Sequence, residues 1–220
     1  MVPSFRRPAV AVSAVLALLV TAACAKREQP ASAPASAEAT PTVVLETSMG
    51  RIVMQFDRAK APRTVDNIVR HLGVQFYDGL IFHRVVAGFV IQTGMATPDG
   101  MVRTSSAPPV PIESDNGLRN ARGTVGLARM TDPNSGAVQF YINLKDSPEL
   151  DFTARSPDGW GYTVFGRVTE GMDVVDRIGR VATGTFRGAR DTPLQPVIVT
   201  RAYLVPRDSA AAPATAAPTR

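Results

Sequence analysis

The sequence Phe82-His83-Arg84-Val85-Val86-Ala87-Gly88-Phe89-Val90-Ile91-Gln92 decides how this chain is interpreted. It places one Arg and one Gln among large apolar residues that recur at alternating positions, a pattern typical of two strands joined by a turn. Binding pockets combine apolar walls with a few well-placed hydrogen-bonding groups. We therefore expect this segment to line an apolar pocket in which Arg84 and Gln92 are the polar groups.

The residues before this stretch predict a hairpin over 42–47 and 51–57, joined by Ser48-Met49-Gly50. In its second half Ile52, Met54 and Phe56 alternate with other residues, which is the period of a half-buried strand. Further short runs rich in Val, Ile, Phe and Thr follow, and residues 197–205 predict a closing strand. Strands therefore dominate the predicted secondary structure.

Two helices are predicted among these strands. The first begins at Pro62 and ends at Gly73, with Val65, Ile68, Val69 and Leu72 on one face. The second covers residues 171–178 and ends at Gly179. Few helices among many strands favour an all-β fold, and this order of elements suits a closed barrel with helices over its ends.

The 220 residues, of which 45% are hydrophobic, suffice for one domain with a buried core. We divide the chain into a signal peptide (1–23), a flexible tether (24–41), one domain (42–206) and a disordered low-complexity tail (207–220). The net charge of +5 falls to about +3 without the leader, from 22 basic and 19 acidic residues. This small excess forms no basic stripe, so we predict no binding to nucleic acid.

The N-terminus is predicted to be an export signal. Arg6 and Arg7 precede an apolar run over 9–20, which is shorter than the roughly 20 residues of a transmembrane helix. Small residues then precede Cys24, the only cysteine, in an arrangement that resembles a bacterial lipobox, although Thr21 stands where Leu is preferred. We predict lipidation of Cys24, hence a protein on the periplasmic side of the envelope, anchored to the outer membrane where there is one. Ordinary cleavage at Ala23-Cys24-Ala25, giving a soluble periplasmic protein, and a permanent span are the alternatives.

Segment 82–92 closely resembles the signature of the cyclophilins, the peptidyl-prolyl cis-trans isomerases. Val86, Val90 and Thr93 depart from it, since the family usually has Ile, Met and Gly there. The resemblance extends over most of the domain, and bacterial periplasmic members are the most similar. Its further segments, in the order of the family, are 116–129, 138–143, 150–152 and 162–168.

This resemblance implies an all-β, closed eight-stranded antiparallel barrel capped by two α-helices. It also implies a prolyl isomerase that needs no cofactor and no metal, works as a monomer, and acts on proline-containing polypeptides such as folding envelope proteins. His71, His83 and Cys24 are too few and too scattered for a metal site. A barrel that binds proline-containing segments with little turnover is the alternative function.

An X-Pro bond rotates against a barrier of about 18–20 kcal/mol, which arises from amide resonance. Twisting the bond turns the prolyl nitrogen into a hydrogen-bond acceptor, so a fixed donor there stabilises the transition state more than the ground state. The resemblance assigns that donor to Arg84. It assigns Gln92 to holding the peptide backbone beside the rotating bond.

The resemblance also assigns substrate contacts. Phe89, Tyr141 and Leu150 match the lining of the proline pocket, although any of them could belong to the core, and Val90 narrows one wall. Ala128, Arg129 and Gln139 match the groove for residues before proline, and Arg129 replaces an Asn found in many relatives. Tyr162 matches a site position that is Tyr in bacterial members, and Glu149 stands where the family has Trp or Phe, a change that we expect to weaken cyclosporin binding. His83 is next to Arg84 but alternates to the other face of the strand, so we expect a packing or orienting residue rather than a proton-transfer group.

Overall fold

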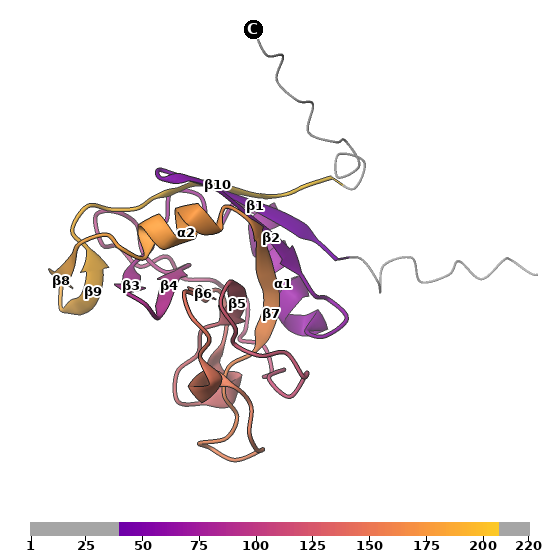
Figure 1. The fold of residues 1–220 in the computed structure, drawn as a ribbon. Helices are drawn as coiled ribbons and strands as arrows, with labels where there is room; N and C mark the ends of the chain where they lie inside the picture. Colours follow the sequence, from indigo (N-terminus) through magenta and orange to yellow (C-terminus); the bar gives the residue numbers. More distant parts are fainter. Residues whose placement is uncertain (1–39, 207–220) are drawn as a thin grey trace, which may run out of the picture. The chain divides into compact units, whose positions relative to one another are not determined.

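The structure is a computed structural model that describes residues 40–206 (Figure 1). The predicted signal peptide, Cys24, the tail and all but the last two residues of the tether lie outside the described residues. No helix within 40–206 is long and apolar enough to cross a membrane.

Eight strands form one antiparallel sheet, and the hairpin predicted over 42–47 and 51–57 is its N-terminal part. The order in the sheet is β10-β1-β2-β7-β5-β6-β4-β3. The bounds are β1 Thr42–Thr47, β2 Gly50–Phe56, β3 Arg84–Val86, β4 Val90–Thr93, β5 Thr124–Leu127, β6 Phe140–Asn143, β7 Val164–Glu170 and β10 Val199–Leu204.

The all-β class is confirmed, but the strand pairing does not run around a closed ring. Strands β10 and β3 are the two edges of the sheet and do not pair with each other as strands. The seam is held just before both strands, by an isolated bridge between Ile81 and Ile198 and a bond from the Phe82 N–H to the Val197 carbonyl at 2.9 Å. Strand β3 has only three residues and begins after the bridge, so the continuous ladder stops there and the sheet is a curled half-barrel.

A second, two-stranded sheet was not predicted. It consists of β8 (Thr183–Phe186) and β9 (Ala189–Pro193), and β9 lies beside β3 at the edge of the main sheet (Figure 1). Arg187 and Gly188 both have positive φ, as a tight hairpin turn demands. Most of its residues are exposed, so the sequence lacks the apolar alternation that would have indicated strands.

Both predicted helices are present, as α1 (Pro62–Gly73) and α2 (Met172–Ile178). Two 3-10 turns, η1 (Pro133–Ser135) and η2 (Pro148–Leu150), lie in the loops. On α1, Val65, Ile68 and Leu72 are buried as expected, whereas Val69 is only partly buried and packs at the margin of the core.

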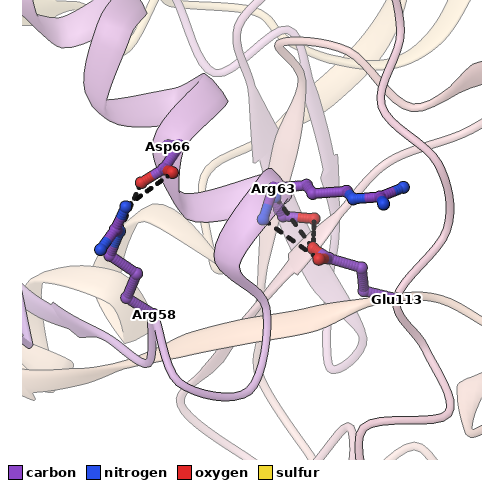
Figure 2. A network of polar contacts seen from close by, with 5 residues as sticks. Arg58, Arg63, Asp66 and Glu113 are labelled. Atoms are coloured by element: carbon purple, nitrogen blue, oxygen red, sulfur yellow. Dashed lines mark hydrogen bonds and ion pairs between the residues drawn. The ribbon is translucent and has the colours of Figure 1, made fainter. Parts of the chain in front are cut away.

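The first turn of α1 is capped from a distant loop. Ala61, at the N-cap position, has no side chain that could satisfy the free backbone N–H groups. Instead Glu113 accepts bonds from the Arg63 N–H at 3.1 Å, the Thr64 N–H at 2.9 Å and the Thr64 hydroxyl at 2.8 Å (Figure 2). Its negative charge also opposes the positive end of the helix dipole. One carboxylate thus fixes α1 to the loop that leads toward β5.

Glu113→Ala should lower the free energy of unfolding by about 1–2 kcal/mol, because two backbone N–H groups of α1 lose their acceptor. Urea denaturation at neutral pH measures this change. Glu170→Ala, which removes an exposed carboxylate at the end of β7, is the matched control. Equal destabilisation by the two variants would show that Glu113 does not cap the helix.

Candidate active site

The register of β3, β4, β6 and β5 gives this part of the main sheet two different faces. Val85, Ile91, Ile142 and Val125 are direct neighbours across β3, β4, β6 and β5, and each is at most 1% exposed. Because successive side chains of a strand point to opposite faces, the adjacent positions must project away from this core.

The adjacent row consists of Arg84, Gln92, Tyr141 and Gly126, which are also direct partners across the four strands. The signature segment therefore forms β3, a turn and β4, as predicted, and brings Arg84 and Gln92 side by side. An Arg nitrogen (Nη1) donates to Gln92 Oε1 at 3.4 Å, and Gln92 Nε2 donates to Gln139 Oε1 at 2.9 Å. Three predicted polar residues are thus joined in one chain of hydrogen bonds.

A cavity of about 330 Å³ opens on this face. All nine residues that line it were predicted as site residues: Arg84, Phe89, Val90, Gln92, Ala128, Arg129, Tyr141, Leu150 and Tyr162. The tenth, Gln139, lines an adjoining cavity of about 150 Å³ that shares Gln92, Ala128 and Arg129 with the first.

A larger cavity of about 450 Å³ lies against β2 and β7, with Gln55, Asp57 and Arg167 among its lining residues. It contains none of the predicted site residues. We place the candidate active site at the smaller cavity because the cross-strand row and the apolar walls converge there.

Tyr141 is held between a glycine and an amide. A Cβ atom at position 126 would overlap the Tyr141 ring, so only Gly lets the ring lie across β5. The Tyr141 hydroxyl donates to Asn120 Oδ1 at 2.7 Å. Burial raises the pKa of this hydroxyl well above its usual value, so Tyr141 acts at neutral pH as a neutral donor with an apolar ring.

Asn120 and Asp151 are supporting residues that the sequence analysis did not single out. The Asn120 amide nitrogen donates to the Leu150 carbonyl at 3.0 Å, and its backbone N–H donates to Asp151 Oδ1 at 2.6 Å. Asn120 therefore ties the Tyr141 hydroxyl to the turn that carries Leu150. Both residues fall inside the quoted family segments, but one polar residue in a loop gives no sign that it supports a distant ring.

Two residues from different loops form the far wall. Tyr162 meets the Tyr141 ring edge-on, with 6.1 Å between ring centroids. The Arg129 guanidinium lies over the Tyr162 ring at 4.6 Å and donates through Nε to the Gly161 carbonyl at 2.8 Å. These contacts fix the position of Arg129 at the edge of the cavity.

The opening of the cavity is flanked by an apolar ring and a charged pair. Phe89 lies in the turn between β3 and β4, with the Lys145 ammonium 5.8 Å above its ring. Lys145 also pairs with Glu149 at 3.4 Å, and both side chains are about half exposed. Glu149 thus lies on η2 beside Leu150 without lining the cavity itself.

His83 lies buried next to Arg84 in the sequence. Burial, and secondarily the charge of Arg84, lower its pKa from 6.5 to about 4, and a hydrogen bond that the protonated ring donates to the Gln139 side chain opposes this shift. Its Nδ1 atom has no hydrogen-bond partner among residues 40–206. A histidine that stays neutral at physiological pH suits the predicted packing role.

Comparison with known proteins gives a consistent result. The family profile described as cyclophilin type peptidyl-prolyl cis-trans isomerase/CLD matches residues 42–204. The chain is 51% identical over 164 residues to peptidyl-prolyl cis-trans isomerase cyp18 of Streptomyces antibioticus, covering 74% of this chain and 98% of the relative. It is 44% identical over 157 residues to peptidyl-prolyl cis-trans isomerase B of Escherichia coli, covering 71% and 95%.

Solved structures agree on the fold. A crystal structure of a cyclophilin type isomerase from Cryptosporidium parvum matches with a TM-score of 0.62 and 19% identity, over 77% of this chain and 99% of the other. A structure of the same protein in the presence of the dipeptide Ala-Pro matches with a TM-score of 0.61, over 76% and 99%.

The His83 ring should remain neutral in the folded protein from pH 8 down to about pH 5, because its pKa is about 4. The chain has only two histidines, so NMR titration of the ring resonances resolves both, and His83→Gln assigns them. A His83 ring that titrates near pH 6.5 would contradict the burial of this side chain.

The free energy of unfolding should depend on pH because of the same lowered pKa of His83. Between pH 6.5 and about 4 the unfolded chain binds a proton at His83 that the folded chain does not, so folding stability falls as the pH drops through this window. Above pH 6.5 His83 contributes no pH dependence. His83→Gln should therefore lose less stability than the unmodified protein between pH 7 and pH 4.5, as measured by urea denaturation.

Proposed function

The chain belongs to the cyclophilin-type peptidyl-prolyl cis-trans isomerases, and we propose that it isomerises X-Pro bonds of exported polypeptides through Arg84 and Gln92. The isomerase activity itself follows from the family match and from bacterial relatives at 51% and 44% identity. The assignment of Arg84 and Gln92 rests on one observation: Arg84, Gln92 and Tyr141 are neighbours across the strands and line one cavity.

Arg84 supplies the donor that this reaction needs. Within residues 40–206 its guanidinium makes one long hydrogen bond, to Gln92 at 3.4 Å, and one ion pair, to Asp191 at 4.0 Å. Neither contact is short enough to hold the group tightly, so N–H groups remain available to the substrate. As the prolyl nitrogen becomes pyramidal, a bond from Arg84 strengthens and lowers the barrier without any covalent step.

The walls suit a proline ring with its flanking backbone. Phe89, Leu150 and the buried face of Tyr141 provide apolar surface, and about 330 Å³ is at the small end of ligand pockets. Gln92, fixed by Gln139, offers its amide to a backbone carbonyl beside the rotating bond. The Cryptosporidium parvum structure in the presence of Ala-Pro supports a proline-containing ligand for this fold.

The substrates are proposed to be envelope proteins that fold after export. This proposal rests on residues 1–24, where a basic start, a short apolar run and small residues precede Cys24. Lipidation of Cys24 followed by the tether 24–41 would hold the isomerase domain beside the membrane surface. Client segments emerging there would meet the domain at a high local concentration.

Arg84→Ala should lower kcat/KM by about 10²–10³, the scale of losing one transition-state donor, while the fold survives. A protease-coupled proline-peptide assay measures turnover, and circular dichroism checks folding. Arg84→Lys is the informative control, because a Lys retains the charge but loses the planar set of donors. Near-normal turnover by folded Arg84→Ala would remove Arg84 from the mechanism and leave peptide binding as the role of this cavity.

The mature protein should fractionate with membranes, and Cys24→Ala should release it or block its processing. One acyl chain binds a membrane only marginally, so stable anchoring needs several chains on the lipidated cysteine. Mass spectrometry of the mature N-terminus gives an independent reading. An unmodified N-terminus beyond residue 24 would rule out the lipid anchor without affecting the assignment of the active site.

A further inference from the structure

The charged side chains around the two adjoining cavities differ in whether they have a counter-charge. Arg84 lies 4.0 Å from Asp191, and Lys145 lies 3.4 Å from Glu149. Arg129 takes part in no ion pair within residues 40–206, although it lines both cavities. Asp132, the acidic residue nearest to it in the sequence, instead accepts the backbone N–H of Asn134 at 2.9 Å.

The Arg129 guanidinium is nevertheless held in place. Its Nε donates to the Gly161 carbonyl at 2.8 Å, and Nη1 donates to the carbonyls of Met130 at 2.8 Å and Thr131 at 3.3 Å. Its plane also lies over the Tyr162 ring. These contacts use three of the five N–H groups of an Arg, and in the described part of the chain both N–H groups of Nη2 have no protein acceptor.

No lining residue of either cavity carries a negative charge. Apart from Arg84 and Arg129, every side chain that lines the two cavities is neutral. A ligand in the adjoining cavity of about 150 Å³ therefore meets one fixed positive charge, that of Arg129, with two open donors on Nη2. A carboxylate matches the positive charge of the guanidinium and can accept a charge-assisted hydrogen bond from Nη2.

We propose that Arg129 selects substrates that carry an acidic side chain close to the isomerised proline. The inference rests on the proposed function, since it assumes that the proline occupies the cavity beside Arg84. A side chain one or two residues away would then reach the adjoining cavity, which shares Gln92 and Ala128 with the first. Arg84 does not add to this selection, because Asp191 offsets its charge and the prolyl nitrogen uses its donors.

The expected preference is moderate because Arg129 is partly exposed. Exposed ion pairs are worth about 0.2–1 kcal/mol, so Glu should be favoured over Gln by about 1.4- to fivefold in kcat/KM. The preference should appear mainly in KM, since the contact is made before and during bond rotation. High salt should remove it, because the Debye length is only about 3 Å at 1 M.

The test uses the full protein and a set of short peptides with one proline. Glu, Gln or Lys is placed in turn at each of the two positions before and after the proline, and exchange rates are measured by NMR without a coupling protease. At one or more positions the unmodified protein should favour Glu over Gln and Gln over Lys. Arg129→Gln should abolish this order at the same position, whereas Arg129→Lys should keep a weaker form of it.

The matched control is Arg167→Gln, which removes one exposed positive charge on β7 away from both cavities. It should keep the full preference, which separates a local contact from an effect of net charge. If Arg129→Gln does not fold, the unmodified protein in high salt still tests the role of charge. Its preference for Glu should then be lost. Turnover of neutral peptides without any preference for Glu would overturn the inference and leave the isomerase assignment intact, whereas absence of all turnover would overturn both.

Discussion

Side chains alternate along a strand with a period of two, so the register of four short strands determines which of their side chains face the cavity. In one register Val85 and its partners face the core, and Arg84, Gln92 and Tyr141 face the cavity. A slip of one residue would bury the guanidinium and expose the apolar row, which makes alternative registers very unfavourable. The hydrophobic effect that folds the sheet therefore also positions the polar side chains to which we assign the reaction.

The strand register determines which residues form the cross-strand row, but residues outside this row hold its side chains in position. Gly126 gives the Tyr141 ring room, and Asn120 connects its hydroxyl with the turn that carries Leu150. Asn120 is only 2% exposed, so each of its hydrogen bonds replaces a costly unsatisfied group. The candidate active-site cavity is thus fixed on one side by the strand ladder and on the other by a buried polar network.

The strand register and the buried polar network differ in how well they could be predicted from the sequence. Alternation in 82–92 predicted β3, β4 and their polar residues, and the family resemblance supplied the nine lining residues of the cavity. Asn120 and Asp151 act through contacts between segments about 30 residues apart, which no local pattern reveals. The exposed β8–β9 hairpin lacks alternation, and the open seam between β3 and β10 depends on where a three-residue strand begins, which sequence patterns do not define.

The arginines of this chain show how one residue type serves two purposes. Arg122 binds Asp176 through two bonds of 2.9 Å, and this geometry commits most of its guanidinium to a fixed partner that locks α2 to the loop before β5. Arg84 instead has a 3.4 Å bond and a 4.0 Å ion pair, which orient the group but leave its donors available. In the proposed role of Arg84, tighter pairing with Asp191 would stabilise the free protein at the expense of the transition state, because the same N–H groups cannot serve both. The loose contacts around Arg84 therefore fit its proposed role as a hydrogen-bond donor to the twisting bond.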